Sequence, residues 1–268
     1  MGTPLISVIL ATYNGSRFLA EAIESVLIQN HPSLELIVID DASTDQRVRE
    51  IVETYIKNDD RIQYERNIEN QERSWSKNRW VELARGEYIS FIDDDDIWDW
   101  DKLTGQLKFL EKNPDIGIVG TWARFVDESG LLIGISEHLN ISPETIEKSV
   151  LITNPFIQSS VLLRKDYFLA TWGFPDFNLC EDYDLWLRIL QMTRWANIPE
   201  TLVTYRVRST STTSKNLYRM KWMTLQLIWK YRKKFPGFSQ AFFFRTITFP
   251  FHIPFLLSVW KKIIRKGS

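Results

Sequence analysis

Cysteine and histidine are scarce in this chain. The only cysteine is Cys180, so no disulfide can form within the chain, which fits a reducing compartment. The three histidines, His31, His138 and His252, match no motif and are interpreted as incidental. These two residue types therefore give no pointer to function.

Long hydrophobic runs are also absent. The first apolar stretch, LISVILA (5–11), follows no Lys or Arg, so we expect a buried strand and no signal peptide. A second uncharged stretch, residues 246–260, has fifteen residues and contains Pro250 and Pro254. A helix that spans a membrane needs about 20 apolar residues, so an interfacial helix or a re-entrant contact is the better interpretation of this stretch.

Acidic residues are missing from the C-terminal part of the chain. Residues 215–268 contain twelve Lys or Arg and no Asp or Glu, whereas residues 1–214 contain 21 basic and 34 acidic residues. The formal net charge of -1 hides this asymmetry. Such a tail is expected to face an anionic partner, which can be a membrane, a nucleic acid or the acidic part of the same chain.

The first half of the sequence alternates strand-like and helix-like segments. The predicted strands are residues 5–11, 34–40, 61–66, 87–93, 115–126 and 131–135, and the predicted helices are residues 16–29, 45–57, 73–85 and 101–112. Strands that are apolar almost throughout indicate a parallel sheet covered by helices. The second half is less regular, with strands expected at 156–164 and 201–207 and helices at 181–190 and 217–235.

Polar residues directly follow three of the predicted strands. TYNGS (12–16), DDASTD (40–45) and DDDD (93–96) each begin where a strand is expected to end. In parallel sheets, ligands bind outside the carboxyl ends of the strands. The three clusters are therefore expected to converge on one crevice.

The acidic run FIDDDDIWDW (91–100) needs a positive partner. Its four adjacent carboxylates repel one another, and burial raises that cost. Asp93 and Asp95 have the spacing of a site for Mg²⁺ or Mn²⁺, because carboxylate oxygens suit these ions and substrate phosphates can supply the other ligands. A helix start with extra acidic residues is the alternative interpretation.

Four motifs occur in the order in which family 2 glycosyltransferases carry them. They are SVILATYNGSRFLAEAIESVLIQ (7–29), ELIVIDDASTD (35–45), ARGEYISFIDDDDIW (84–98) and EDYDLWLRI (181–189). The sequence resembles this family over roughly residues 5–210. The resemblance implies an α/β fold of the GT-A type, with a Rossmann-like, mostly parallel sheet covered by helices.

The activity that the resemblance implies is sugar transfer with inversion. The donor would be a nucleotide diphosphate sugar, with UDP- or dTDP-sugars favoured, and the acceptor would be the hydroxyl of a glycan or a lipid-linked glycan. The expected setting is the biosynthesis of bacterial cell-surface polysaccharide or lipopolysaccharide.

The resemblance also implies a donor site at the carboxyl ends of the strands. The residues that would bind the nucleotide sugar there are Thr12, Tyr13, Asn14, Asp41, Asp93 and Asp94. Among them, Asp41 matches the residue that contacts the base, and Asp93 matches one that serves the ribose. Asp95 is the expected ligand of a Mn²⁺ or Mg²⁺ cofactor, which would stabilise the charge that develops on the leaving diphosphate.

A second carboxylate motif, ED at 181–182, implies the catalytic step. Asp182 matches the general base of the family, which takes the proton of the acceptor hydroxyl as it attacks. Glu181 is expected on the acceptor side. The alternative for both is a pair of charges that only stabilises a helix start, worth well under ~1 kcal/mol each when exposed.

Two positions depart from the pattern of the family. Many relatives have Arg-Asn where this chain has Lys77-Asn78, and Lys77 would meet a phosphate or base oxygen as a point charge, not as a bidentate fork. Many also have a histidine where this chain has Arg208. Arginine cannot ligate a metal as histidine does, but it can pair with the diphosphate. We therefore expect Lys77 and Arg208 to bind the nucleotide sugar.

The acceptor side is less well defined by the sequence. Trp98 and Trp172 are expected to border the acceptor, because aromatic faces stack on sugar rings. Core packing is the alternative for these residues, and it is favoured for Trp186, which sits on an apolar helical face.

The predicted division into domains follows the charge. Residues 1–214 are predicted to form the glycosyltransferase domain, and residues 215–268 a basic, aromatic-rich helical extension. This extension is expected to bind the cytoplasmic face of a membrane peripherally, through bases that meet anionic headgroups. A helical subdomain packed on the main body or on a partner subunit is the alternative. Nucleic acid is not expected, because no recognition motif accompanies the charge.

Two other function classes share the fold. A non-catalytic nucleotide- or Ca²⁺-binding module would have lost the carboxylates of the DxD or ED motif, and both motifs are present. A nucleotidyltransferase would more typically have a glycine-rich loop with Arg or Lys after the first strand. TYNGS (12–16) has one glycine and no lysine.

Overall fold

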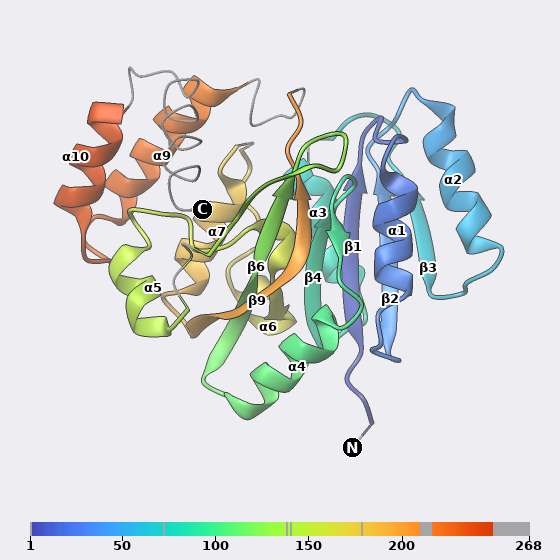
Figure 1. Cartoon of the computed structure of the whole chain (residues 1–268), viewed down its shortest axis with the longest axis horizontal. Coiled ribbons are helices and arrows are strands. Elements are labelled where there is room, and N and C mark those ends of the chain that lie inside the picture. The colour runs from blue at the N-terminus through green and yellow to red at the C-terminus, as the bar shows by residue number, and fades with distance from the viewer. Residues whose placement is uncertain are drawn as a thin grey trace.

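The described chain forms one mixed sheet with helices on both of its faces (Figure 1). The computed structural model describes residues 2–71, 73–137, 139, 141–177, 179–209 and 216–248. Residues 210–215 and 249–268, as well as His138, lie outside the described residues. Most of the uncharged stretch 246–260 and part of the predicted extension 215–268 are therefore not described.

The regular elements follow the order of the sequence. The strands are β1 (Ile6–Thr12), β2 (Leu34–Asp40), β3 (Ile62–Arg66), β4 (Tyr88–Asp93), β5 (Ile97–Trp98), β6 (Ile116–Val126), β7 (Leu132–Ile135), β8 (Leu162–Arg164) and β9 (Arg194–Arg206). The helices are α1 (Leu19–Leu27), α2 (Gln46–Ile56), α3 (Arg73–Leu83), α4 (Lys102–Lys112), α5 (Pro143–Ser149), α6 (Lys165–Ala170), α7 (Glu181–Ile189), α9 (Leu217–Tyr231) and α10 (Phe238–Thr248), with the 3-10 turn η1 (Gln158–Ser160).

The sheet is parallel in the first half of the chain and mixed in the second. Its order is β3-β2-β1-β4-β8-β6-β9-β5, with β7 beside β6. Strands β1 to β4 are parallel to their neighbours within this group, and β6 is parallel to β9. The short strand β8 runs antiparallel to both β4 and β6 and joins the two halves. The predicted α/β fold is confirmed, and the antiparallel pairings are made by the short strands β5, β7 and β8.

The register of the first strands places the polar clusters at one edge. Strands β1 and β2 are almost entirely buried, as their apolar sequences predict. Thr12 at the end of β1 pairs with Asp40 at the end of β2, and Ala11 pairs with Asp93 at the end of β4. The loops that follow therefore start side by side, and the predicted convergence is confirmed.

Two predicted strands of the second half have different bounds. Residues 156–164 do not form one strand, because Ser159 and Ser160 lie in the turn η1 and only residues 162–164 form β8. Strand β9 begins at Arg194, well before the predicted 201–207. It pairs with β6 along its whole length, with irregular register next to Trp122, and this long-range pairing is invisible in a local pattern.

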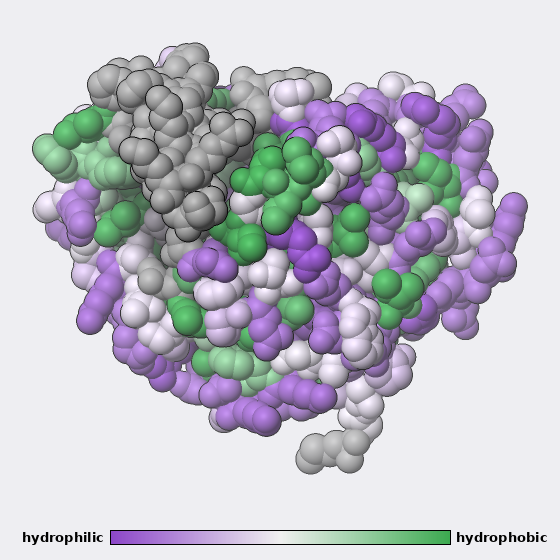
Figure 2. Space-filling view, in the orientation of Figure 1, coloured by the Kyte–Doolittle hydropathy of each residue, from purple (hydrophilic) through white to green (hydrophobic). Residues whose placement is uncertain are grey.

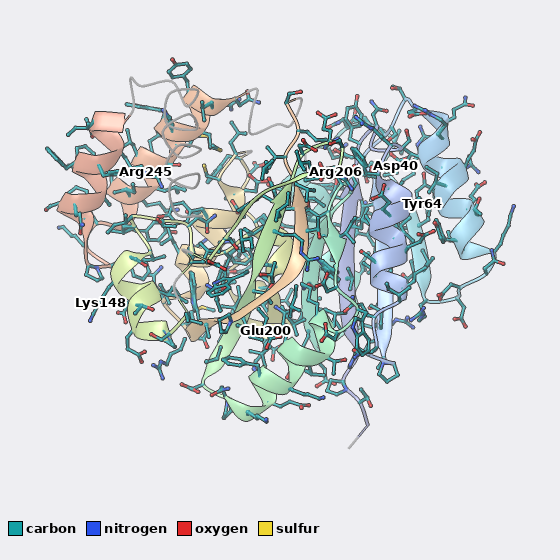
Figure 3. All side chains as sticks on the ribbon, viewed as in Figure 1. Asp40, Tyr64, Lys148, Glu200, Arg206 and Arg245 are labelled. Atoms are coloured by element: carbon teal, nitrogen blue, oxygen red, sulfur yellow. The ribbon has the colours of Figure 1, made fainter. Side chains whose placement is uncertain are left out.

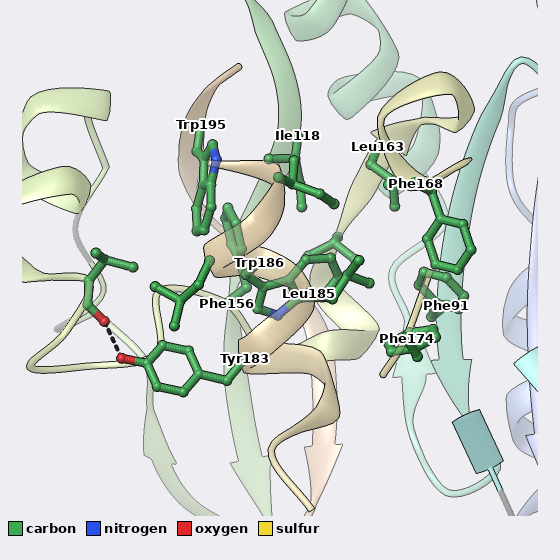
Figure 4. Packing of buried hydrophobic residues seen from close by; sticks show 14 of the residues in the cluster. Phe91, Ile118, Phe156, Leu163, Phe168, Phe174, Tyr183, Leu185, Trp186 and Trp195 are labelled. Atoms are coloured by element: carbon green, nitrogen blue, oxygen red, sulfur yellow. Dashed lines mark hydrogen bonds between the residues drawn. The ribbon is translucent and has the colours of Figure 1, made fainter. Parts of the chain in front are cut away.

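Two hydrophobic cores cover the two faces of the sheet. One lies beneath α1, α2 and α4, and the other beneath α3, α6, α7 and α9. Figure 4 shows the second core, whose aromatic members include Phe91, Phe156, Phe168, Phe174, Tyr183, Trp186 and Trp195. Burying each of these side chains stabilises the fold by roughly 1.5–3 kcal/mol. Trp186 is thus a core residue, as its position on an apolar helical face predicts.

Helix α9 packs on α7, and α10 packs on α9. Leu227, Ile228 and Tyr231 of α9 are buried in the same core as α7. The buried carboxylate of Asp184 on α7 accepts hydrogen bonds from Lys230 at 2.7 Å and from the hydroxyl of Tyr231 at 3.0 Å. The described part of the predicted extension is therefore packed on the main body, as the alternative interpretation states. The boundary at 214 and the membrane contact stay predictions.

The surface of α10 is partly apolar. Phe243, Phe244 and Ile247 are each about half exposed or more, with exposed fractions of 67%, 53% and 49%. Figure 2 shows this apolar surface at the left of the view, over α10. Among the described helices, none combines the length and the apolar character that a membrane span requires.

Candidate active site

The loop after β1 is fixed by a bridging asparagine. Asn14 has a positive φ of 56°, a conformation that asparagine tolerates better than most residues. Its Oδ1 accepts hydrogen bonds from the backbone N–H groups of Thr44 and Asp45 at 2.9 and 3.0 Å. Asn14 therefore ties the loop of β1 to the loop of β2, and its neighbour Tyr13, 46% exposed, faces the cleft described below.

A second link joins the loop of β1 to the acidic run. Thr12 Oγ1 donates to Asp94 Oδ2 at 2.6 Å, and both side chains are buried. A Cβ at Gly15 would lie 1.9 Å from the same oxygen, so only glycine fits at this position. Thr12 and Asp94, predicted to bind the nucleotide sugar, are engaged with each other in the structure.

Asp93 and Asp95 are the accessible carboxylates of the acidic run. Asp93 lines the cleft, and its backbone N–H donates to Ser159 Oγ at 3.1 Å. The carboxylate of Asp95 forms an ion pair with Arg208, whose Nε lies 2.5 Å from Asp95 Oδ2. The two residues of the predicted DxD motif thus differ: Asp93 faces the cleft, and Asp95 faces an arginine.

Asp96 is buried and holds the acidic run in place. Its carboxylate accepts hydrogen bonds from the Ser159 hydroxyl and from the backbone N–H of Arg206, the latter at 3.0 Å. Arg206 Nε also donates to the backbone oxygen of Asp95 at 3.1 Å (Figure 3). Burial, with the charges of Asp93 and Asp95, raises the pKa of Asp96 well above its ordinary value. The carboxylates of the run therefore meet one guanidinium, that of Arg208, which pairs with Asp95, whereas the guanidinium of Arg206 bonds the backbone of the run and pairs with Glu21.

The two aspartates at the end of β2 are both buried, but only Asp41 lines the cleft. Asp40 is buried, and its Oδ2 accepts a hydrogen bond from the hydroxyl of Tyr64 at 2.7 Å (Figure 3). Asp41 lines the cleft, and its Oδ1 accepts from Asn67 Nδ2 at 2.7 Å and from the backbone N–H of Gln71 at 3.0 Å. Asp41 is therefore the member of the pair that can reach a ligand.

The start of α7 directs two carboxylates into the cleft. Cys180 precedes the helix with a φ of 61°, so the chain turns sharply before Glu181 and Asp182. Both carboxylates line the cleft, and Asn154 Nδ2 donates to Asp182 Oδ2 at 3.1 Å. The predicted base Asp182 therefore lines the same cleft as Asp93 and Asp41.

Asp182 has a raised pKa. Burial is the main cause, and the charge of the neighbouring Glu181 adds to it. Hydrogen bonds from the Tyr183 backbone and Asn154, and the charge of Lys77, offset part of this effect. The resulting pKa of about 6 leaves the carboxylate ionised at neutral pH and makes it a stronger base than an exposed aspartate.

Lys77 lies behind the cleft wall. The residue is 2% exposed and does not line the cleft. Its Nζ donates to Gln158 Oε1 at 3.0 Å and lies 5.5 Å from the centre of the Phe174 ring. In the structure Lys77 acts on Gln158 and on the charge of Asp182, and a direct contact with a nucleotide sugar stays a prediction.

The cleft has a volume of about 740 Å³ and collects residues from distant parts of the chain. Its polar lining residues on the strand side are Tyr13, Asp41, Asn70, Asp93, Asn154, Gln158 and Tyr205. Its polar lining residues on the helical side are Glu181, Asp182, Tyr183, Asn216, Arg219, Thr224 and Arg245. The cleft can hold a polar molecule that spans the distance from the sheet edge to α9 and α10.

The acidic run fits a cation that arrives with a diphosphate. Within the residues that the structure describes, no three His, Cys, Asp or Glu side chains form a metal cage. Mg²⁺ and Mn²⁺ need only one or two carboxylates when substrate phosphates supply further ligands. Asp93 and Asp95 provide such a pair, and Arg208 occupies Asp95 in this structure. A bound cation would therefore have to displace the guanidinium of Arg208 from Asp95 or share the Asp95 carboxylate with it.

The prediction that Trp98 borders the acceptor is wrong. Its side chain is 1% exposed, its Nε1 donates to the backbone oxygen of Ser159, and its ring packs against Lys102. Burial of Trp98 in the core beneath α4 leaves no face for a sugar. Trp172 is 92% exposed but does not line the cleft. The structure therefore brings neither tryptophan into the cleft that Asp182 lines.

Several residues that line the cleft could not be predicted from the local sequence around them. Arg219 and Arg245 come from α9 and α10, and the sequence gives their charge but not their direction. Tyr205 and Gln158 come from strands and turns whose pairing is long-range. Asn154 belongs to none of the four motifs of the sequence.

Comparison with known proteins agrees with this geometry. A mannosyltransferase of Pyrobaculum calidifontis, solved in complex with GDP-Man and Mn²⁺, superimposes with a TM-score of 0.70 over 96% of this chain and 73% of that chain, at 20% identity. The fold is therefore that of GT-A glycosyltransferases.

The family follows from the sequence comparisons. Residues 7–169 match the family model "Glycosyl transferase family 2". An uncharacterized glycosyltransferase of Methanocaldococcus jannaschii is 30% identical over 94% of this chain and 89% of its own length. The O-antigen biosynthesis glycosyltransferase WbnJ of Escherichia coli is 30% identical over 78% of this chain and 82% of its own length. The chain belongs to glycosyltransferase family 2 and is related to enzymes of polysaccharide biosynthesis.

Proposed function

We propose that this glycosyltransferase moves a sugar from a nucleotide diphosphate sugar to an acceptor hydroxyl with inversion at the anomeric carbon. The observation that carries the proposal is that Asp41, Asp93 and Asp182 all face one cleft. The first two lie at the ends of parallel strands, where nucleotides bind in open α/β sheets. The third lies at the start of α7 and has a base-like pKa.

The donor would lie along the edge of the sheet. Asp41 would contact the base, Tyr13 would cover it, and Asp93 would accept hydrogen bonds from the ribose. Asn14 and Thr12 would act indirectly, because their hydrogen bonds fix the loops that carry these groups. A UDP- or dTDP-sugar is the favoured donor, and the GDP-Man of the Pyrobaculum neighbour shows that this fold also accepts a guanine nucleotide.

Asp95 would hold Mn²⁺ or Mg²⁺ next to the diphosphate. The Mn²⁺ in the Pyrobaculum neighbour supports this assignment. When bound, such a cation stabilises the negative charge of the leaving nucleoside diphosphate as a Lewis acid. The side chain of Arg208 would move from Asp95 to the diphosphate, where its guanidinium can form two parallel hydrogen bonds.

Asp182 would act as the general base. Its carboxylate would take the proton of the acceptor hydroxyl while the oxygen attacks the anomeric carbon. Inversion requires the attack to come from the face opposite the diphosphate, and Asp182 lines the cleft on the helical side while Asp93 lines it on the strand side. Asn154 would orient the base through its hydrogen bond.

The cellular role that we propose is polysaccharide or lipopolysaccharide biosynthesis at the cytoplasmic face of a membrane. The relation to an O-antigen enzyme supports the glycan part of this proposal. The exposed apolar side chains of α10 and the absence of acidic residues from 215–268 support a peripheral contact with anionic lipid.

A thermal-shift panel tests the donor assignment. UDP, GDP, dTDP and CMP are each added with and without Mn²⁺, because a ligand of the native state raises the melting temperature by mass action. We expect a Mn²⁺-dependent rise with one nucleotide that is lost in Asp95→Asn and kept in the control Asp60→Asn, in the exposed turn between α2 and β3. No rise with any nucleotide would contradict the proposed donor site and favour a non-catalytic module.

A further inference from the structure

One short segment of the chain contacts both chemical ends of the cleft. At the proposed base, Asn154 Nδ2 lies 3.1 Å from Asp182 Oδ2. At the acidic run, Ser159 Oγ accepts a hydrogen bond from the backbone N–H of Asp93 at 3.1 Å. Gln158 belongs to the same segment, in η1, and lines the cleft. The transferred sugar has to lie between the group that holds the donor and the base, so Gln158 is placed to contact it.

The side-chain amide of Gln158 is oriented by a buried lysine. Lys77 is 2% exposed, and its Nζ donates to Gln158 Oε1 at 3.0 Å. The ring of Phe174, whose centre lies 5.5 Å from Nζ, covers another side of the cation. An ammonium group only donates, so it holds the amide oxygen on its own side and leaves the NH2 group directed away from it. Lys77 therefore determines which polar atom of Gln158 is available to a ligand.

The amide nitrogen of Gln158 is an unsatisfied donor. Nε2 is buried, and among the residues that the structure describes no atom accepts a hydrogen bond from it. Native proteins rarely leave a buried N–H group unpaired, because such a group loses its bonds to water and gains none in return. The terminal torsion of a glutamine is broad, so the N–H group can adjust to a ligand in the cleft that Gln158 lines. Such a ligand would supply the missing acceptor.

We propose that Gln158 binds the transferred sugar, by donating a hydrogen bond from Nε2 to a hydroxyl or carbonyl oxygen of that sugar. Lys77 is then a positioning residue, which acts on the sugar through Gln158 and does not touch the nucleotide. A sugar without an oxygen at this position would leave the N–H group unpaired, so the contact also selects among donors. The inference rests on the proposed function, because it names the residue that recognises the sugar in the same cleft.

Calorimetric titration of the full chain in the presence of Mn²⁺ tests the inference. The probes are UDP, UDP-glucose, UDP-N-acetylglucosamine, dTDP, dTDP-glucose, GDP and GDP-mannose, so that each nucleotide sugar is compared with its own nucleoside diphosphate. Gln158→Met removes the N–H group without a change in charge, and Gln158→Glu removes it but keeps an acceptor for Lys77. The matched control is Gln240→Glu, because Gln240 is exposed on α10 and does not line the cleft.

We expect at least one nucleotide sugar to bind both Gln158 variants about ten-fold more weakly than wild type, since each variant lacks one buried hydrogen bond to the ligand. The matching nucleoside diphosphate should bind both variants within about two-fold of wild type. Gln240→Glu should leave every affinity unchanged. Gln158→Glu keeps a partner for Lys77, so it should fold even where Gln158→Met, which deprives the buried ammonium of this partner, does not.

A double-mutant cycle tests the positioning role of Lys77. Lys77→Met should weaken the same nucleotide sugar, because the amide loses the group that orients it. In the Gln158→Met background, Lys77→Met should have no further effect. A full effect of Lys77→Met in that background, or an equal loss for the nucleoside diphosphate, would show that Lys77 does not act through Gln158 and would overturn this role.

Three outcomes would overturn the assignment of Gln158: no nucleotide sugar loses affinity in Gln158→Glu, the nucleoside diphosphate loses as much affinity as its sugar derivative, or Gln240→Glu has the same effect. A nucleotide sugar that binds wild type and all variants equally would leave the proposed donor site intact and overturn only this inference. If no nucleotide binds wild type, the proposed function itself is contradicted, and the inference with it. The two failures are therefore distinguishable.

Discussion

Two aspartates that lie two residues apart on α7, Asp182 and Asp184, are expected to affect stability in opposite directions. Asp182 is ionised in a half-buried cleft and has a raised pKa, so its charge is a cost to the folded state. Asp184 is buried but paired, with Lys230 Nζ at 2.7 Å and Arg188 Nε at 2.9 Å. Asp182→Asn removes the cost of a charge in a half-buried site. Asp184→Asn removes two ion pairs.

The magnitude for Asp182→Asn follows from the raised pKa. The shift from 3.8 to about 6 corresponds to at most about 3 kcal/mol, at 1.36 kcal/mol per pKa unit. Well below pH 3.8 the carboxyl is protonated in both folded and unfolded chains, so no cost is present. As the pH rises from about 4 to about 6, the unfolded chain ionises first and the wild-type protein loses stability. Asparagine does not ionise, so the variant gains on wild type over this window.

Urea unfolding followed by tryptophan fluorescence at pH 4.5 and pH 7.5 measures this difference. The free energy of unfolding of Asp182→Asn relative to wild type should rise between the two pH values, while its transfer activity falls about 10²- to 10⁴-fold. Asp184→Asn should be less stable than wild type by about 3 kcal/mol at pH 7.5, because Arg188 and Lys230 lose their partner. A relative stability of Asp182→Asn that is the same at both pH values would refute the reasoning.

Two further substitutions test the loops that build the donor site. Arg208→Gln removes the guanidinium that lies 2.5 Å from Asp95. We therefore expect free Mn²⁺, titrated by electron paramagnetic resonance, to bind several-fold more tightly, and the nucleoside diphosphate to bind more weakly. Weaker Mn²⁺ binding would contradict the idea that Arg208 competes with the cation for Asp95. Gly15→Ala places a Cβ 1.9 Å from an oxygen of Asp94, so we expect a loss of roughly 1–3 kcal/mol in thermal unfolding, and an unchanged melting temperature would show that the loop has room to move.

Much of the fold could be predicted because its first half obeys local rules. Runs of β-branched apolar residues predict β1 and β2, and apolar residues at helical spacing predict α1. The rule that ligands bind at the carboxyl ends of parallel strands places the polar clusters correctly. The second half depends on long-range pairing. The extension of β9 back to Arg194 is stabilised by β6, more than seventy residues earlier, so no local window contains the reason for it.

The candidate site could be predicted by residue type but not by orientation. The repulsion within the acidic run predicts a positive partner, and Arg208 pairs with one of its carboxylates, Asp95. The sequence does not say that Asp96 turns into the core while Asp93 turns into the cleft. The same limit explains Trp98, which lies in β5 and is buried where this short strand pairs with the distant β9.

The location of the basic helices α9 and α10 could not be predicted from their sequence. Their charge and aromatic content predict an anionic partner, and a membrane and a packed subdomain both fit that description. Packing of Leu227 and Ile228 on α7, together with the position of Arg219 and Arg245 in the cleft, shows that these helices also complete the site. Only the tertiary structure carries this information.

The central claim is that Asp93 binds the donor and Asp182 performs the chemistry in one cleft. Calorimetric binding and turnover of the nucleotide sugar selected by the thermal-shift panel, with Mn²⁺ present, separate these roles. The account predicts that Asp182→Asn binds the donor as wild type does but does not transfer the sugar, whereas Asp93→Asn loses binding. Transfer by Asp182→Asn at a rate near that of wild type would contradict it.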